Sequence, residues 1–269
     1  AEIVKMADGI PVYVSAGIDQ DFKPTASAIE KAITPKTKML LFSSPCNPTG
    51  SVFSKRELNA IANVLAKYPE IYIVSDEIYE YINFTGKHYS IGSIDKVRQQ
   101  TITVNGFSKD YSMTGWRIGY IGAPKEVAAA CEKIQGQVTS GASSFGQIAA
   151  AFALTYSNRA TDLMRKEFKK RRDLVIDLLS KIKGVKVNHP EGAFYVFPDI
   201  SYYFGKSDGK NTIRNADDFC DYIMLNAYVG IVSGSAFGDN NCFRLSYAAS
   251  ESQLKEAIDR ISKALEKLK

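Results

Sequence analysis

Short runs of apolar residues alternate with amphipathic segments over the first part of the chain. The apolar runs have the length and the β-branched content of strands. Strands are predicted at Val12–Ser15, Met39–Ser43, Ile71–Ser75, Thr101–Asn105 and Ile118–Gly122. Helices are predicted near Thr25–Ile33 and Lys55–Lys67. Near-continuous apolar strands that alternate with amphipathic helices predict an α/β fold, with a mainly parallel sheet covered by helices on both faces.

The predicted helix at Lys55–Lys67 has a clear start signal. Ser54 and Glu57 have the spacing of a capping box, in which each side chain bonds the backbone amide of the other residue. Leu58, Ile61 and Leu65 recur at helical spacing. They therefore form one apolar stripe that faces the core.

After about residue 157 the pattern changes. A long helix is predicted at Arg159–Lys183, and a last helix begins at Ser250, where Gln253 completes a capping pattern. Further strands are predicted at Ala193–Phe197, Val229–Val232 and Cys242–Tyr247, and Ser207–Asn215 reads as a polar loop. We expect two domains: a large α/β domain at residues 1–157 and a smaller α+β domain at residues 158–269, entered by the long helix.

Composition excludes several functional classes. The 269 residues are 45% hydrophobic and 23% charged, which is typical of globular proteins, and the net charge is only +5. Lys and Arg do not cluster with aromatic residues, so no nucleic-acid partner is expected. No apolar stretch has the length of a membrane span, and the N-terminus lacks a signal-peptide pattern.

Cysteine and histidine spacing argues against a metal site. The two histidines, His88 and His189, have no neighbour at ligand spacing, and the cysteines are scattered at Cys46, Cys131, Cys220 and Cys242. Zinc sites and histidine-based hydrolases are therefore not expected. Four scattered thiols favour a reducing compartment, the cytoplasm.

The chain begins without an initiator methionine. Ala1–Met6 reads as the end of a helix. We expect the chain to begin inside a larger protein.

The most informative run is Asn105–Gly119, which contains Lys109 and Arg117. A lone lysine is usually a solvated surface group. Lysine is, however, also the side chain that forms Schiff bases with carbonyl compounds, and arginine is the preferred bidentate partner of phosphate. Together they suggest a pocket for a phosphorylated aldehyde.

Polar residues follow successive predicted strands in the order Asn47, Asp76, Tyr79 and Lys109. Each has an ordinary explanation by itself: Asn47 lies in a turn-forming sequence, and Asp76 can cap a helix. In open α/β sheets, however, ligands bind beyond the carboxyl ends of the strands. An amine, a carboxylate for the ring nitrogen and donors to the 3′ oxygen are what a pyridoxal phosphate site requires.

Four sequence motifs carry a specific resemblance. Asn-Pro-Thr-Gly, Ser-Asp-Glu-Ile-Tyr, Ser-Lys-x5-Thr-Gly-Trp-Arg-Ile-Gly and Phe-Arg-Leu-Ser-Tyr occur in this order. The chain resembles the fold-type I pyridoxal-phosphate aminotransferases over essentially its whole length. Among these it most resembles the bacterial-type aspartate aminotransferases. The resemblance implies that the large domain binds the cofactor and is incomplete at its N-terminal end.

The resemblance also implies roles for individual residues. Lys109 would form the imine with the cofactor and move the proton between the substrate Cα and the cofactor C4′. Asp76 would pair with the ring nitrogen. Asn47 and Tyr79 would contact the 3′ oxygen, with Asn47 also near the substrate carboxylate. The remaining implied roles concern anions: Ser108 and Arg117 at the cofactor phosphate, and Arg244 at the substrate α-carboxylate.

The implied reaction moves an amino group from aspartate to 2-oxoglutarate in a homodimer with sites at the subunit interface. Alternatives on the same fold are an aromatic or prephenate aminotransferase and a C–S β-lyase, since a fold does not determine the reaction. A non-catalytic aminotransferase-like sensor domain is a third class. The substrates that are converted distinguish the three enzymes. The sequence upstream of Ala1, where a fused DNA-binding module would lie, distinguishes the sensor.

The chain departs from the family pattern at its start. Relatives are longer there and place an aromatic ring on the cofactor and a phosphate-binding loop in the additional segment. Gly106 also stands where certain relatives have a phosphate-binding serine. We therefore expect these 269 residues alone to bind the cofactor weakly and to turn over slowly.

Overall fold

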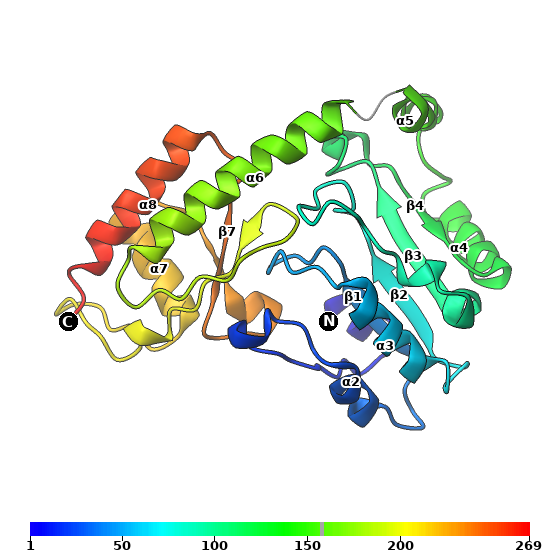
Figure 1. The fold of residues 1–269 in the computed structure, drawn as a ribbon, viewed down its shortest axis with the longest axis horizontal. Helices are drawn as coiled ribbons and strands as arrows, with labels where there is room; N and C mark the ends of the chain where they lie inside the picture. Colours follow the sequence, from blue (N-terminus) through cyan, green and yellow to red (C-terminus); the bar gives the residue numbers. More distant parts are fainter. Residues whose placement is uncertain (157–158) are drawn as a thin grey trace.

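The computed structural model describes residues 1–156 and 159–269. It contains two sheets, and the long helix α6 runs between them (Figure 1). The α-helices are α1 (Glu2–Met6), α2 (Ala26–Ala32), α3 (Lys55–Leu65), α4 (Lys125–Val138), α5 (Ser144–Tyr156), α6 (Arg159–Ser180), α7 (Ala216–Ala227) and α8 (Glu251–Leu265). The strands are β1 (Met39–Ser43), β2 (Tyr72–Asp76), β3 (Thr101–Gly106), β4 (Gly119–Gly122), β5 (Tyr195–Val196), β6 (Val232–Ser233) and β7 (Phe243–Ser246).

The larger sheet has the order β1-β2-β3-β4. β1 and β2 pair in parallel, as do β2 and β3, whereas β4 runs antiparallel to β3. Parallel neighbours need a crossover connection, and α3 supplies it between β1 and β2. The predicted mainly parallel sheet is therefore confirmed. Its carboxyl edge carries the residues that follow β1, β2 and β3.

Helix α3 covers one face of this sheet. Its N-terminus has the predicted capping box, in which Ser54 and Glu57 each bond the other's backbone amide. Leu58, Ile61 and Leu65 are at most 2% exposed and belong to the core that also contains the β2 side chains. The opposite face is less covered than predicted, because alternate β1 residues are exposed: Met39 by 47% and Leu41 by 60%.

For the first part of the chain, one prediction was wrong and two helices were missed. Val12–Ser15 is not a strand; Val12 is 71% and Tyr13 64% exposed, whereas a strand needs a hydrogen-bonded neighbour. The helices α4 and α5 were not predicted. They lack the usual signal of a buried stripe, because α4 buries none of its residues and α5 buries only Gly146 and Ala150.

The C-terminal part packs helices against a small antiparallel sheet of order β5-β7-β6. Helix α8 packs on α6 and α7, and the predicted capping box of Ser250 and Gln253 is present. Apolar residues at helical spacing are buried along α8 at Leu254, Ile258, Ile261 and Leu265, and Leu268 just after the helix is buried as well. This confirms the α+β prediction. Helix α7, which was not predicted, starts at an Asn215 cap.

Several element ends differ from the prediction. Helix α6 ends at Ser180 rather than Lys183, and the strand predicted at Val229–Val232 begins only at Val232, which is the first residue to pair with β7. The predicted domain boundary falls on residues 157 and 158, which lie outside the described residues, so this division remains a prediction. None of the described helices is long and apolar enough to cross a membrane.

The two parts are joined through loops as well as through α6. Tyr79 and Ile82, which follow β2, are buried in the core of the C-terminal part. The Asn188 side chain donates to the carbonyl of Thr49 (2.6 Å), and the Gly192 amide donates to the carbonyl of Gly50 (2.8 Å). Gly50 has a φ of +68°, and a Cβ there would lie 2.5 Å from a proline side chain. These contacts hold the loop after β1 against the segment that leads into β5.

Candidate functional site

Asp76 and Lys109 follow neighbouring parallel strands of the larger sheet. Asp76 is the last residue of β2 and is aligned with Ser43 of β1 and Val104 of β3. Lys109 is half-buried in the turn that follows β3. The topology therefore brings the carboxylate and the amine to one edge of the sheet, as the sequence predicts.

Asp76 is partly buried, and within the described part of the chain it has no cationic partner. Burial raises the pKa of its carboxyl group, and the neighbouring charge of Glu77 raises it further. The Ile78 amide, which donates to Asp76 Oδ1 (3.1 Å), acts in the opposite direction. A positively charged ligand group next to Asp76 would stabilise the ionised carboxylate.

Tyr79 lies at the junction of the two parts and is only 3% exposed. Its ring contacts Phe194 and Tyr195 edge-on, with centroids 5.4 Å and 5.9 Å away. The hydroxyl oxygens of Tyr79 and Tyr195 are 3.1 Å apart. Burial raises the pKa of the Tyr79 phenol, and the contact with Tyr195 adds to this shift. Tyr79 therefore keeps its proton and can donate it in a hydrogen bond.

Arg244 and Asn47 meet although they are 197 residues apart in the chain. Arg244 Nη1, on β7, donates to Asn47 Oδ1 (2.9 Å). The guanidinium carbon lies 4.6 Å from the Tyr195 ring centroid and 5.0 Å from that of Phe237. These two rings hold the guanidinium in place through cation–π contacts. Asn47 turns its oxygen toward Arg244, so its amide hydrogens face away from the guanidinium.

Phe194 connects Lys109 with the tyrosine pair. The Lys109 amine lies 5.9 Å from the Phe194 ring centroid, and the Phe194 and Tyr195 centroids are 4.7 Å apart. The strand prediction included Phe194 and Tyr195, but they were not predicted as site residues. The available signal was the aromatic-rich run Phe194-Tyr195-Val196-Phe197, which directly follows Gly192-Ala193.

Ser108 and Arg117 lie in the same loop as Lys109, but the contacts described above do not include them. Ser108 is half-buried. Arg117 is exposed, has a φ of +55°, and donates from Nη1 to the carbonyl of Thr114 (2.8 Å). The structure therefore places Arg117 on the surface of the loop. The phosphate roles of both residues remain predictions.

Asp110, directly after Lys109, is a buried acid that sequence reasoning missed. It is 1% exposed, and its Oδ2 accepts the amide of Tyr81 (3.2 Å). Its Oδ1 is buried without a hydrogen-bond partner in the part of the chain that the structure describes. Burial raises the pKa of Asp110 to about 8; the charge of Glu80 adds to this shift, and the amides of Tyr81 and Ile82 oppose it. Asp110 thus ties the Lys109 loop to the turn after Tyr79.

We predict that Asp110→Asn removes a pH-dependent loss of stability. The carboxyl pKa is 3.8 when unperturbed and about 8 in the folded protein. The stabilisation that comes from this raised pKa is therefore fully present below about pH 4 and is lost progressively as the pH rises to about 8. Relative to Asp110→Asn, the wild type should lose up to about 1.4 kcal/mol of unfolding free energy per pH unit within this window. Urea denaturation of the cofactor-free protein at several pH values measures this change in unfolding free energy.

The exposed Asp95 offers a control for this experiment, since Asp95→Asn should follow the wild-type pH profile. Parallel profiles for the wild type and Asp110→Asn would contradict the prediction.

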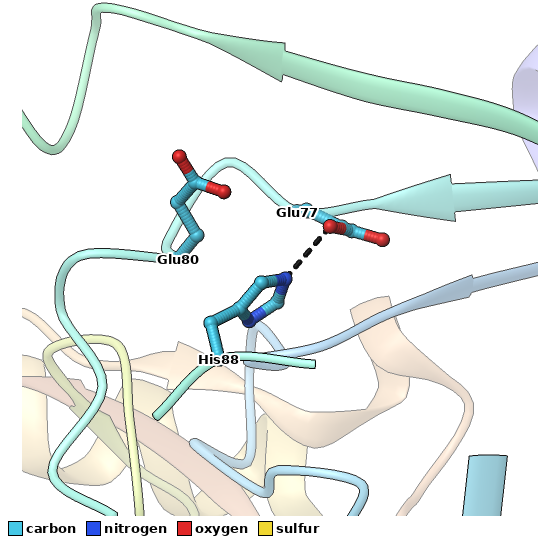
Figure 2. Close-up of side chains that lie close together, drawn as sticks. All are labelled: Glu77, Glu80 and His88. Atoms are coloured by element: carbon cyan, nitrogen blue, oxygen red, sulfur yellow. Dashed lines mark hydrogen bonds and ion pairs between the residues drawn. The ribbon is translucent and has the colours of Figure 1, made fainter. Parts of the chain in front are cut away.

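A second cluster, formed by Glu77, Glu80 and His88, lies beyond the end of β2 (Figure 2). The spacing of the sequence indicated no ligand neighbour for His88, but the fold brings one potential ligand atom of each residue within 4.8 Å of the others. Glu77 Oε2 lies 2.7 Å from His88 Nε2, and Glu77 Oε1 accepts the hydroxyls of Ser75 (2.9 Å) and Ser90 (2.7 Å). Both oxygens of Glu77 are therefore bonded within the protein, and these bonds anchor the residue that follows β2.

Comparisons with known proteins agree with the geometry. The family described as "Aminotransferase class I and II" matches residues 1–261. The chain is 45% identical to a bifunctional aspartate aminotransferase and glutamate/aspartate-prephenate aminotransferase of Petunia hybrida, with 100% of this chain and 57% of the relative covered. It is 41% identical to an aspartate aminotransferase of Pinus pinaster, with 98% of this chain and 55% of the relative covered.

The chain thus spans a little over half the length of these two curated relatives. The crystal structure of an aspartate aminotransferase from Rhizobium meliloti superimposes with a TM-score of 0.96 at 39% identity, over 100% of this chain and 68% of that one. The sequence match extends over nearly every residue, and the fold matches throughout. The chain therefore belongs to the aminotransferase class I and II family.

Proposed function

We propose that the protein transfers the amino group of aspartate to 2-oxoglutarate, with pyridoxal phosphate as its cofactor. The observation that carries the proposal is the continuous set of contacts from Lys109 through Phe194, Tyr79 and Tyr195 to Arg244. These contacts support a single site that contains an amine, a phenol donor and an arginine. Asp76 contributes a carboxylate at the same edge of the sheet.

The residues present fit the functional groups of this cofactor. Lys109 can bond its aldehyde, Asp76 can hold its ring nitrogen protonated, and Tyr79 with the Asn47 amide can donate to its 3′ oxygen. Arg117 uses one N–H on Thr114, and a guanidinium has five, so it has donors left for the phosphate. When bound, pyridoxal phosphate supplies an aldehyde that takes up the amine and a ring that accepts the electron pair from the substrate Cα.

The side chains of this protein would then divide the work. Arg244 binds the α-carboxylate of the substrate, and the two aromatic rings hold its guanidinium in place. The Lys109 amine takes the proton from the substrate Cα and returns it to the carbon that retains the amino group. Asp76 holds a proton on the ring nitrogen, and its buried position makes that cationic partner favourable.

The names of the relatives support aspartate as the amino donor and add a second candidate acceptor. The Petunia hybrida relative is named for both aspartate and prephenate aminotransfer. Prephenate is therefore the alternative acceptor with an observation in its favour. Part of the proposal is also that the protein works as a homodimer in the cytoplasm. The four cysteines are free thiols, which supports a reducing compartment.

A substrate comparison tests the proposal. The protein, saturated with pyridoxal phosphate, is given aspartate and either 2-oxoglutarate or prephenate, and the amino-acid product is quantified. We expect glutamate from 2-oxoglutarate, together with oxaloacetate. Faster transfer to prephenate would favour the second candidate. Pyruvate release from cystathionine, without amino transfer, would identify a C–S lyase and contradict the proposal.

A further inference from the structure

Tyr195 contacts two residues of the site, and its hydroxyl has been given no role so far. It lies on β5 and is 7% exposed. Its hydroxyl lies 3.1 Å from the hydroxyl of Tyr79, and its ring lies 4.6 Å from the guanidinium carbon of Arg244. One side chain therefore contacts both the residue placed at the cofactor oxygen and the residue placed at the substrate carboxylate.

The direction of the hydrogen bond between the two tyrosines follows from a count of protons. Each phenol has one proton to donate. If Tyr79 donated to Tyr195, no proton would remain on Tyr79 for a ligand oxygen. If Tyr195 donates instead, the Tyr79 proton is available, and a phenol that accepts a hydrogen bond becomes a stronger donor.

We propose that Tyr195 is a positioning residue: its hydroxyl donates to the Tyr79 oxygen and so directs the Tyr79 proton toward the 3′ oxygen of the bound cofactor. This inference rests on the proposed function, because it requires the cofactor to lie next to Tyr79. The hydrogen bond between Arg244 and Asn47 also orients a donor group of the site. Arg244 occupies the Asn47 oxygen (2.9 Å) and so turns the amide hydrogens of Asn47 away from itself.

The hydroxyl and the ring of Tyr195 have separable effects. Tyr195→Phe removes the hydroxyl and keeps the ring against Arg244, whereas Tyr195→Leu removes both. The Phe variant should therefore change the pKa of the absorbance band of the bound cofactor, with little change in the KM for aspartate. The Leu variant should also raise that KM, because the guanidinium loses one of its two aromatic contacts.

The readout is the pKa at which the absorbance band of the Lys109-bound cofactor titrates. Donors to the 3′ oxygen withdraw electron density from the ring system and lower this pKa. Tyr195→Phe weakens the Tyr79 donor and should raise it by about half a unit, the scale expected for one hydrogen bond. Tyr79→Phe should raise it further, because the donor itself is then absent.

The double variant decides whether Tyr195 acts through Tyr79. We expect Tyr79→Phe/Tyr195→Phe to titrate like Tyr79→Phe alone, because the Tyr195 hydroxyl then has no phenol to act on. Tyr222→Phe is the matched control. Tyr222 is also a buried tyrosine of the C-terminal part, but its hydroxyl donates to the carbonyl of Ala264 (3.0 Å), so its removal should leave the pKa unchanged.

Each outcome has one meaning. A wild-type band that titrates like that of Tyr195→Phe would overturn the inference and leave the proposed function intact. Additive shifts in the double variant would show that Tyr195 does not act through Tyr79, which also overturns the inference. A wild-type protein without any Lys109-dependent band would overturn the proposed function, and this inference with it.

Discussion

Replacement of Lys109 by alanine is expected to abolish the absorbance band of lysine-bound pyridoxal phosphate and to lower amino transfer by about 10⁴-fold or more. In the proposed function, Lys109 is both the nucleophile that bonds the cofactor and the base that moves the Cα proton. Lys109 is the amine that approaches the Phe194 ring, and the buried Asp110 follows it in the chain.

Two further variants make this result specific. Lys109→Arg keeps a positive charge at the position but cannot form the imine, so it should be as inactive as the alanine variant. Lys125→Ala removes an exposed lysine at the start of α4 and should behave like the wild type. Retention of the band in Lys109→Ala would show that the cofactor bonds another residue.

The second large effect is expected for Arg244→Gln, which should reduce kcat/KM for aspartate by about 10²- to 10³-fold. Arginine binds a carboxylate through two parallel charge-assisted hydrogen bonds, each worth about 1.5–3 kcal/mol, and glutamine offers neither the charge nor the fork. The substitution also removes the donor that holds the Asn47 oxygen. The amide of Asn47 can then rotate away from the cofactor.

Arg244→Lys separates charge from geometry. It retains the cation but not the planar fork that lies between the Tyr195 and Phe237 rings. Its loss in kcat/KM should therefore be smaller than that of Arg244→Gln, and should appear mainly as a higher KM. Arg260→Gln, at a surface ion pair of α8, is the control and should leave both constants unchanged. Equal kcat/KM values for Arg244→Gln and the wild type would show that another residue binds the α-carboxylate of the substrate.

Local patterns in the sequence predicted the elements whose signals lie within a few residues. The capping boxes of α3 and α8 formed as predicted, because each joins residues three apart. The buried stripes of these two helices followed from the helical period. A misleading local signal gave a wrong prediction at Val12–Ser15, where the apolar run has no strand to pair with in the described chain. Helices α4 and α5 were missed because they have almost no buried side chains.

The candidate site shows the same division. The sequence placed Asp76 and Lys109 at the ends of adjacent strands, since parallel strands carry their carboxyl ends to one edge. It did not reveal His88 beside Glu77, because the loop between them determines that contact. It also could not show that Arg117 lies exposed on its loop, since that position depends on a left-handed backbone at this residue.

Local sequence signals thus sufficed to predict the strands of the larger sheet, the capping boxes and the residue types at the edge of that sheet. Which of these residues touch depends on how distant segments pack in the folded protein. Asn47 meets Arg244 across 197 residues, and Tyr79 meets Tyr195 across 116. The signals that can be read from the sequence, capping patterns and side-chain period, span only one or two turns of chain. Contacts over such separations exist only after the loops at Thr49 and Gly192 have docked the C-terminal part against the sheet.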